Sequence, residues 1–539
     1  MCGIFGLTEN NPRLVQDLID TCSHRGPDGS NIYYNDKITL GHNLLAITST
    51  PKDGSQPWIS SNKNVLIYNG EIFNYNEIVL RFKNNFKPRT TCDTELLIWL
   101  LNNYSYREVI SKIIDSMHAF AFYNKQENEL VLSRDHVGIK PIYFAETNSG
   151  IVFSSEIKAL KKHIRTSNTI DRLALACTCM LGVNVLRQTI FKGIYKILPG
   201  ETIVYDLQRK KIKDSFRTLI KPLSNKKFDS EDFYQETAKT ISNSTLGLRK
   251  FGVFLSGGID SSIMAYELNK SIKSLNTFTN VMNPNVIINE ENHNSDAIIS
   301  KRFSNENGFD HKEIEITPEI IVDNWDSAIN TIEEPRYNWN LPMYYYTNKI
   351  LSKNNVVVTM AGDIGDEILG GYPHYYRMTK MLEKPKNWND FILLWMRKFA
   401  SPVNLKMKFN YEDLQQLLIQ SLPEELWNPD DFVNSAMALD CITTVSEDFF
   451  SRNDRFGMKF SMEGRFPLAS KKFMEYCMSI HSKFKIGNDL SETKLPIKKS
   501  YANKIPEYIF SKKKTGWSVP ITAWIKDSKI IKNKFFETV

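Results

Sequence analysis

The opening stretch of the chain, MCGIFG, places a cysteine at position 2. Removal of Met1 would leave Cys2 with both a thiol and a free α-amine. An α-amine titrates near pH ~8, so at neutral pH part of it is unprotonated and can accept a proton. A nucleophile paired with a terminal amine is a known way to activate a weak attacking group. The alternative is a cysteine that merely follows the initiator methionine, and these residues alone leave both interpretations open.

A second candidate site lies in FGVFLSGGIDSS, residues 251–262. The pattern predicts a buried strand that runs through a glycine turn into a helix beginning near Ser261. At the carboxyl end of a parallel strand, the helix N-terminus offers unpaired N–H groups to a ligand. Two glycines let the backbone approach a polyphosphate closely, and the adjacent serines add hydroxyl donors. Asp260 would repel phosphates, but it suits a Mg²⁺ ion that bridges them.

A second acidic turn follows another apolar run, in VVVTMAGDIGDEILGGY, residues 356–372. Asp363, Asp366 and Glu367 lie between the β-branched segment and a glycine break. Carboxylates at the ends of two parallel strands are placed to share a divalent ion with Asp260. The alternatives are an ordinary Gly-Gly turn at the first stretch and a solvated acidic helix cap at the second.

The elements expected to position these residues differ between the two halves of the chain. Residues 1–205 read as short apolar runs such as NVLIYNG and HAFAFYN, with helical spacing near 12–23 and 94–104, which predicts a strand-rich layered domain. Residues 206–230 are polar and are expected to be a linker. Beyond them, strands at 251–255, 275–281 and 355–362 alternate with helices, which predicts a parallel sheet, and the chain is mostly helical from about 375.

Composition narrows the class of protein. The 539 residues carry a formal charge of +7 with scattered basic residues, which argues against a dedicated nucleic-acid surface. No run approaches the length of a membrane span, and the N-terminus lacks the pattern of an export signal. The seven cysteines have no framework spacing, so we expect reduced thiols in a cytoplasmic protein.

The chain resembles the glutamine-hydrolysing asparagine synthetases over nearly its whole length. The motifs that carry the resemblance occur in family order and are MCGIFG, HRGPD (24–28), YNGEIFNY (68–75), RDHVGIKPIYF (134–144), FSSEIKAL (153–160), LSGGIDSS (255–262), GDIGDEILGGY (362–372), MEGRFPL (462–468) and KTGWSVP (514–520).

The resemblance implies an α/β protein with an α+β N-terminal domain. Residues 2–205 would form a class II glutamine amidotransferase, an N-terminal-nucleophile αββα sandwich. In it Cys2 would attack the glutamine amide, and Asn69 and the Gly70 N–H would hold the oxyanion. Asp93 would anchor the glutamine α-ammonium, with Glu71 nearby.

The same resemblance implies that residues 231–539 form a Rossmann-like ATP-pyrophosphatase domain with a helical C-terminal region. A carboxylate would attack ATP to give an acyl-adenylate, which ammonia from the first site would convert to an amide. Lys514 would neutralise charge during adenylation, and Asp260 and Asp366 would hold Mg²⁺. The residues expected to contact ATP are Leu255, Ser256, Gly257, Gly258, Asp260, Ser261, Ser262, Gly362 and Asp363. The family also suggests a homodimer.

Departures from the family pattern bear on the substrates. Leu44 stands where the family has an arginine that grips the glutamine α-carboxylate, and Asn43 is one candidate to replace it. Ser470 stands where the family usually has an aspartate, and the residues facing the acceptor, near Glu333, are the least certain. The acceptor is therefore expected to be aspartate, with another carboxylate such as a uronic acid of a nucleotide sugar or polysaccharide as the alternative. A catalytically silent homologue and a nucleic-acid-modifying enzyme are two further hypotheses, which the retained motifs and the absence of a basic aromatic groove disfavour.

Overall fold

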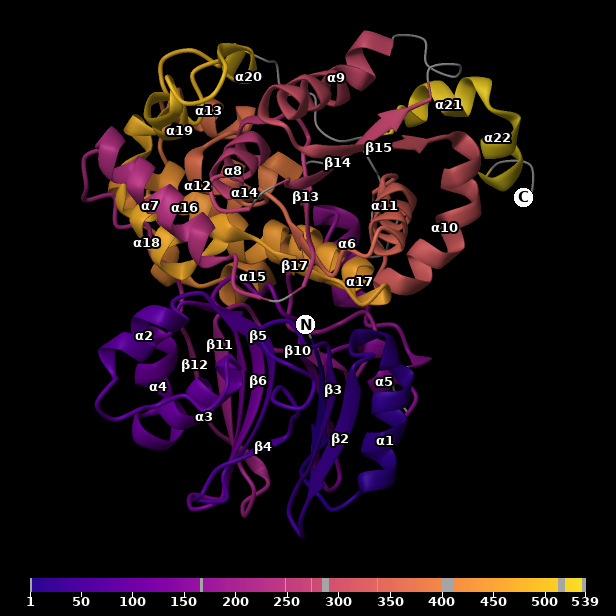
Figure 1. Cartoon of the computed structure of the whole chain (residues 1–539), viewed down its shortest axis with the longest axis vertical. Coiled ribbons are helices and arrows are strands. Elements are labelled where there is room, and N and C mark those ends of the chain that lie inside the picture. Colours follow the sequence, from indigo (N-terminus) through magenta and orange to yellow (C-terminus); the bar gives the residue numbers. More distant parts are fainter. Residues whose placement is uncertain are drawn as a thin grey trace.

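A computed structural model describes residues 2–164, 168–247, 249–272, 274–283, 290–336, 338–399, 411–511 and 519–535. The first part of the chain forms two six-stranded antiparallel sheets, which lie in the lower half of Figure 1. The first sheet has the order β10 (Tyr195–Lys196), β8 (Tyr143–Thr147), β9 (Gly150–Ser154), β1 (Gly3–Leu7), β3 (Thr39–Leu44) and β2 (Gly29–Tyr34). The second has the order β12 (Lys211–Arg217), β11 (Glu201–Asp206), β7 (Glu129–Arg134), β6 (Ser116–Asn124), β5 (Val65–Ile72) and β4 (Trp58–Ile59).

The two sheets pack face to face and helices cover their outer faces. Side chains from both sheets, such as Ile4 on β1 and Ile67 on β5, share one buried core. Helix α1 (Pro12–Thr21) packs on the first sheet, and α3 (Asp93–Asn103) packs on the second. The α1 N-terminus follows from its sequence, because the Asn11 side chain accepts a hydrogen bond from Leu14 N and Pro12 takes the first helical position. The predicted αββα sandwich is confirmed.

The polar stretch expected to be a linker contains a strand. β12 pairs with β11 as the edge of the second sheet, and most of its residues are exposed or half-buried. An edge strand that is solvated on one side can be polar throughout, so hydropathy alone does not reveal it.

The second part of the chain is built on a five-stranded parallel sheet (Figure 1). Its order is β15 (Asp310–Ile316), β14 (Asn276–Met282), β13 (Phe251–Phe254), β16 (Val358–Met360) and β17 (Glu463–Arg465). Two separate hydrophobic cores cover its faces. One includes α8 (Ile259–Asn269) and α9 (Glu290–Asn307), and the other includes α10 (Pro318–Ile332) and α11 (Leu341–Lys353). The predicted parallel sheet is confirmed, and the structure shows helices on both of its faces.

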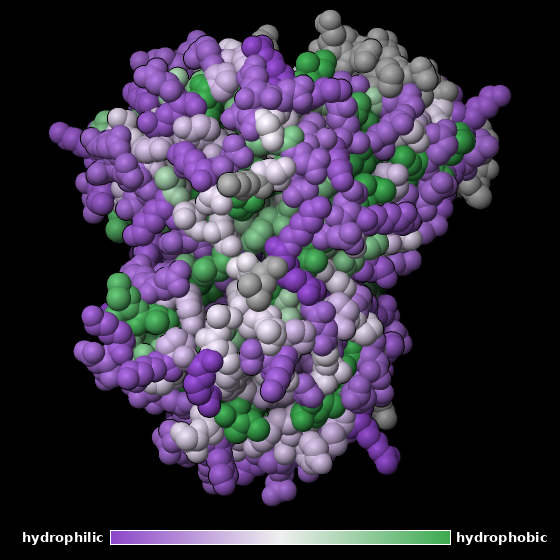
Figure 2. Space-filling view, in the orientation of Figure 1, coloured by the Kyte–Doolittle hydropathy of each residue, from purple (hydrophilic) through white to green (hydrophobic). Residues whose placement is uncertain are grey.

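Helices dominate the rest of the chain, as the sequence predicts. The remaining α-helices are α2 (Tyr75–Arg81), α4 (Tyr106–Glu108), α5 (Ile157–Lys161), α6 (Arg172–Leu181), α7 (Ser230–Asn243), α12 (Gly365–Leu369), α13 (Pro373–Thr379), α14 (Trp388–Met396), α15 (Tyr411–Ser421), α16 (Phe432–Asp440), α17 (Ser451–Lys459), α18 (Lys471–Ser479), α19 (Leu495–Tyr501), α20 (Glu507–Ser511), α21 (Ile521–Asp527) and α22 (Lys529–Phe535). Within the described ranges, no helix is both long and apolar enough to cross a bilayer. Hydrophilic residues cover most of the face shown in Figure 2, with hydrophobic residues in small scattered patches.

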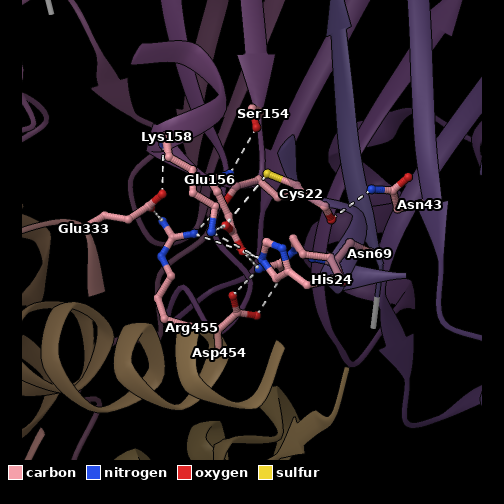
Figure 3. Close-up of polar contacts among 12 residues, drawn as sticks. Cys22, His24, Asn43, Asn69, Ser154, Glu156, Lys158, Glu333, Asp454 and Arg455 are labelled. Atoms are coloured by element: carbon pink, nitrogen blue, oxygen red, sulfur yellow. Dashed lines mark hydrogen bonds and ion pairs between the residues drawn. The ribbon is translucent and has the colours of Figure 1, made fainter. Parts of the chain in front are cut away.

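A buried polar network joins the two parts of the chain (Figure 3). Arg25 donates from Nη1 to Asp454 Oδ2 at 2.8 Å and to Glu156 Oε1 at 2.9 Å, and its side chain is fully buried. Arg455 follows Asp454 on α17, and its Nη2 lies 2.7 Å from Glu333 Oε2. Glu333 in turn accepts hydrogen bonds from the backbone at the start of α5, including Lys158 N at 2.8 Å. Glu333, which the sequence placed near the acceptor, therefore serves the domain interface.

The serine that departs from the family pattern is also an interface residue. Ser470 caps α18 and donates from Oγ to Asp115 Oδ2 at 2.6 Å. Asp115 also accepts from Lys471 N at 2.7 Å. The first domain thus provides a carboxylate at this helix N-terminus, where a negative charge is favourable.

Candidate functional site

Cys2 lies at the start of β1, in a small pocket between the two parts of the chain. Its backbone nitrogen donates to Asn69 Oδ1 at 2.9 Å. Asn69 belongs to β5, in the opposite sheet, so the sandwich brings the two residues together across its core. The Cys2 thiol is buried, and burial raises its pKa, while a hydrogen bond with the Leu45 backbone acts in the other direction.

The hydrogen bond to Cys2 fixes the orientation of the Asn69 amide. Because Oδ1 faces the Cys2 nitrogen, Nδ2 is left as a donor, and it is buried with no hydrogen-bond partner among the described residues. An unpaired buried donor is costly unless a ligand meets it. Gly70 follows, and a side chain there would collide with the Met117 carbonyl at 2.2 Å. Asn69, the side-chain member of the predicted oxyanion pair, therefore lies beside the Cys2 nitrogen with Nδ2 as a donor, and Gly70 is the next residue on the same strand.

Three carboxylates face this pocket. Glu71 on β5 and Asp93 on α3 come from the first domain, and Glu463 comes from β17 of the second. Asp93 accepts from Ile72 N at 3.1 Å, yet burial raises the pKa of its carboxyl to about 6. Burial likewise raises the pKa of Glu71, against the opposing effect of Arg465. Such a pocket suits a cation such as an α-ammonium group.

At the position of the family arginine, Leu44 is apolar, and the side chain of its neighbour Asn43 points away from the pocket. Leu44 lines the pocket and packs with Cys2 and Ala46. Asn43 is wrong as a replacement, because its Nδ2 donates to the carbonyls of Ile19 at 3.0 Å and Cys22 at 2.9 Å instead (Figure 3). Side chains alternate along a strand, so consecutive residues 43 and 44 face opposite sides of the sheet.

The second site lies at the carboxyl end of β13. Gly257 has a left-handed φ of 65°, and a side chain there would lie 2.6 Å from the Asp296 carbonyl, so this turn requires glycine. The Ser256 and Ser261 hydroxyls lie 3.0 Å apart, and Ser261 also donates to the Gly258 carbonyl at 3.1 Å. The Ser262 hydroxyl is buried and has no hydrogen-bond partner among the described residues. Leu255 follows the last residue of β13, Phe254, and is fully buried just before this loop.

The acidic turn after β16 packs directly on this loop. A side chain at Gly362 would lie 2.9 Å from Asp260 Cβ, and one at Gly365 would lie 2.6 Å from Asp260 Oδ1. Between these glycines, Ile364 adopts a left-handed φ of 74°, which is a strained conformation for a β-branched residue. The turn therefore holds Asp260 and Asp366 close together, as the sequence predicted.

Lys494 lies between the two aspartates. Its Nζ contacts Asp260 Oδ2 and lies 2.7 Å from Asp366 Oδ1. Burial lowers the pKa of Lys494, but the two carboxylates outweigh burial and raise it. Sequence reasoning missed Lys494, because it is one lysine in the polar stretch SETKLPIKK and no local pattern distinguishes it. The lysine singled out instead, Lys514, lies outside the described residues.

Asp260 and Asp366 present the oxygen ligands that Mg²⁺ prefers, at a point where a positive charge already lies between them. Within the described part of the chain, no group of three or more His, Cys, Asp or Glu side chains is gathered as metal ligands. Mg²⁺ is commonly held by one or two carboxylates together with substrate phosphates. The residues present therefore fit an ion that arrives with a nucleotide.

Asp363 of the acidic turn and Arg452 influence each other electrostatically. Burial raises the pKa of the Asp363 carboxyl to about 6, and Arg452 opposes that shift. Arg452 lies on α17, stacks over Tyr344 at 4.1 Å and lies 3.2 Å from Asp448 Oδ2. Its Nε is buried without a hydrogen-bond partner among the described residues. An anionic group is the natural partner for such a nitrogen.

A thiol pocket in one domain and a serine-glycine loop with paired aspartates in the other define a glutamine amidotransferase joined to a synthetase. A sequence profile described as a glutamine amidotransferase domain matches residues 1–216. A profile described as asparagine synthase matches residues 233–533, which is more than half of the chain. The protein therefore belongs to the asparagine synthase family.

Two relatives match nearly the whole of this chain and most of their own length. The chain is 26% identical over 593 residues to asparagine synthetase (glutamine-hydrolyzing) 3 of Bacillus subtilis, covering 100% of this chain and 92% of that protein. It is 25% identical over 579 residues to asparagine synthetase (glutamine-hydrolyzing) 1 of the same organism, covering 98% and 88%. A solved allosteric regulatory enzyme of purine biosynthesis matches with a TM-score of 0.31 and 15% identity, over 51% of this chain and 64% of that one.

Proposed function

We propose that this protein is a glutamine-dependent ligase that uses MgATP to convert aspartate to asparagine through an acyl-adenylate. The observation that carries the proposal is the pairing of Asp260 and Asp366 around Lys494 at the carboxyl ends of two parallel strands. That cluster is connected through β17 to the pocket of Cys2.

In the donor half, the mature enzyme begins at Cys2, whose freed α-amine is held by Asn69 Oδ1. The amine accepts the thiol proton, and the thiolate attacks the glutamine side-chain amide. Asn69 Nδ2 and Gly70 N–H stabilise the oxyanion, an effect worth roughly 10²–10³ in rate for each donor. The C–N bond breaks, ammonia leaves, and water hydrolyses the thioester to release glutamate.

In the synthetase half, ATP lies on the loop from Leu255 to Ser262 and contacts Gly362 and Asp363 of the acidic turn. The N-terminus of α8 and the serine hydroxyls hold its phosphates. Asp260 and Asp366 would hold Mg²⁺, which would neutralise phosphate charge when bound. Lys494 orients the leaving pyrophosphate and stabilises charge on the α-phosphate. Lys514 also neutralises charge during adenylation, as its place in the family motif predicts.

Two oppositely charged side chains at the acidic turn, Asp363 and Arg452, favour aspartate among the possible acceptors. Arg452 can pair with an α-carboxylate, and Asp363 can pair with an α-ammonium group. Aspartate carries both groups next to the carboxylate that is activated. A uronic acid, the second candidate acceptor, has no ammonium group and would leave Asp363 unpaired.

The remaining parts of the proposal concern organisation. The glutaminase domain spans residues 2–205, residues 206–230 connect it, and the synthetase domain spans 231–539, with β12 extending the first sheet into the connecting stretch. The protein acts in the cytoplasm on small-molecule substrates, as a homodimer, without a nucleic-acid or membrane partner. Ammonia passes between the sites through the domain interface.

The test is an acceptor panel with purified protein lacking Met1. Glutamine and MgATP are supplied with aspartate, glutamate, a free uronic acid or a UDP-linked uronic acid, and AMP, pyrophosphate and the amide product are measured. Pyrophosphate release that depends on aspartate supports the proposal. Release with a uronic acid alone supports the second acceptor class. No release with any acceptor contradicts the ligase assignment.

A further inference from the structure

The donor pocket has polar groups that can bind the side-chain amide and the α-ammonium group of glutamine, but the described residues offer none for its α-carboxylate. Asn69 Nδ2 is an unpaired buried donor for the oxyanion, and Glu71 Oε1 is a buried acceptor with no hydrogen-bond partner among the described residues. Together with Asp93, Glu71 can receive an α-ammonium group. Free glutamine also carries an α-carboxylate, and a charge buried without a partner is strongly unfavourable.

No lysine or arginine lines this pocket among the described residues, and the apolar side chain of Leu44 packs with Cys2. The arginines close by are engaged elsewhere. Arg465 is fully buried and binds Glu71 and Glu463, while Arg25 is held by Asp454 and donates from Nε to the Cys2 carbonyl at 3.1 Å.

Two cations near the pocket mouth are the possible replacements. Arg249 lies 3.3 Å from Asp28 Oδ2, and the same oxygen accepts a hydrogen bond from Ala46 N at 2.9 Å. Arg249 is therefore neutralised by Asp28 outside the pocket. Lys52 is exposed in the loop between the lining residues Ser49 and Gly54, so water solvates its charge.

Among the described residues, the pocket lining thus holds three carboxylates and no lysine or arginine, and the adjacent Arg465 is already paired with two of those carboxylates. We propose that its preferred nitrogen donor is a glutamine whose α-carboxylate is neutral, as in an amino-terminal glutaminyl residue of a peptide. This inference rests on the proposed amidotransferase function of Cys2. The donor keeps its α-ammonium group, which the acidic pocket attracts, and loses the negative charge that the pocket repels.

The reaction itself is unchanged. The thiolate of Cys2 attacks the side-chain amide, the C–N bond breaks and ammonia leaves with the proton taken from the thiol. Water then hydrolyses the thioester, so the product is a glutamyl residue with its α-carboxyl group still blocked. No oxidant or further reactant is needed.

The test compares free L-glutamine, L-glutamine methyl ester and the dipeptide glutaminyl-glycine as substrates of the full chain. Ammonia release is measured, since it reports amide cleavage and is blind to ester hydrolysis, and the Cys2→Ala variant gives the background. We expect kcat/KM for the ester and the dipeptide to exceed that for glutamine by at least about tenfold, as an unpaired buried charge implies. A kcat/KM for glutamine equal to or above both would overturn the inference.

Leu44→Arg should restore preference for free glutamine, mainly through KM, while Leu44→Met should leave the wild-type order unchanged. If Leu44→Arg fails to fold, the wild-type comparison still decides. A glutamine preference that disappears in Arg249→Gln or Lys52→Ala would overturn the inference and identify the anchoring cation. If the protein cleaves the amide of none of these donors and also fails to ligate free ammonia, that result would contradict the proposed function instead.

Discussion

Arg465 on β17 donates from Nη2 to Glu71 Oε2 on β5 at 3.1 Å, and so joins the two domains at the edge of the donor pocket. The same arginine donates from Nε to Glu463 Oε1 at 2.6 Å. Its backbone carbonyl accepts from Ala361 N at 3.2 Å, one residue before the acidic turn begins. The buried side chain of Arg465 therefore contacts the edge of the donor pocket, while its backbone carbonyl binds the residue that leads from β16 into the acidic turn.

Arg465→Ala should destabilise the fold strongly. It would leave Glu71 and Glu463 as buried carboxylates without their cation, a loss of about 3–5 kcal/mol for a broken buried pair. Urea unfolding measures the free energy. The matched control is Lys472→Ala, which removes an exposed interdomain pair with Glu77 and should cost less than about 1 kcal/mol. An equal loss of unfolding free energy in the two variants would show that the buried Arg465 ion pairs stabilise the fold no more than an exposed pair does.

Lys494→Met should reduce aspartate-dependent pyrophosphate formation by about 10² or more, because a fixed positive charge next to the phosphates is lost. Hydrolysis of the donor amide should continue, since Lys494 lies in the other domain. Lys499→Met on the same helix, at an exposed position, is the control and should leave both activities unchanged. A wild-type rate of pyrophosphate formation in Lys494→Met would show that Lys494 has no role in the reaction.

Donor use should depend on the ionisation of Asp93. Burial raises the pKa of its carboxyl to about 6, so Asp93 becomes anionic as the pH rises through that value. Only the anion attracts the donor's α-ammonium group, and kcat/KM for amide hydrolysis should therefore fall about tenfold per pH unit below pH ~6. In Asp93→Asn this fall of kcat/KM at low pH should disappear, and KM should be high at every pH. A wild-type profile that is flat between pH 5 and 7 would contradict this role.

The sequence was sufficient for the fold class because hydrophobic periodicity and glycine turns are local signals. Residues 251–262 show a strand, a turn and a helix start within twelve positions, and the structure has them in that order. The strand β12 escaped prediction because an edge strand needs no apolar face. Its pairing partner, β11, supplies the hydrogen bonds that hydropathy does not report.

The site was predictable only where its residues lie in one motif. Cys2, Asn69, Asp260 and Asp366 each belong to a short motif that carries the family resemblance. Lys494 lies 234 positions from Asp260, and nothing in its neighbours indicates that the fold brings them together. Glu463 and Arg465 stand in a recognised motif, but the position of Glu463 in the donor pocket and the contact of Arg465 with Glu71 at its edge depend on how the two domains dock.

The central claim is that a thiol in the first domain supplies ammonia to an activated carboxylate in the second. The most direct test is Cys2→Ala, assayed with MgATP and aspartate, first with the better amide donor and then with ammonium chloride. We expect asparagine formation from the amide donor to fall to background while ammonia-driven formation stays within about twofold of wild type, because each site has its own catalytic groups. Synthesis from the amide donor that persists in Cys2→Ala would contradict the account.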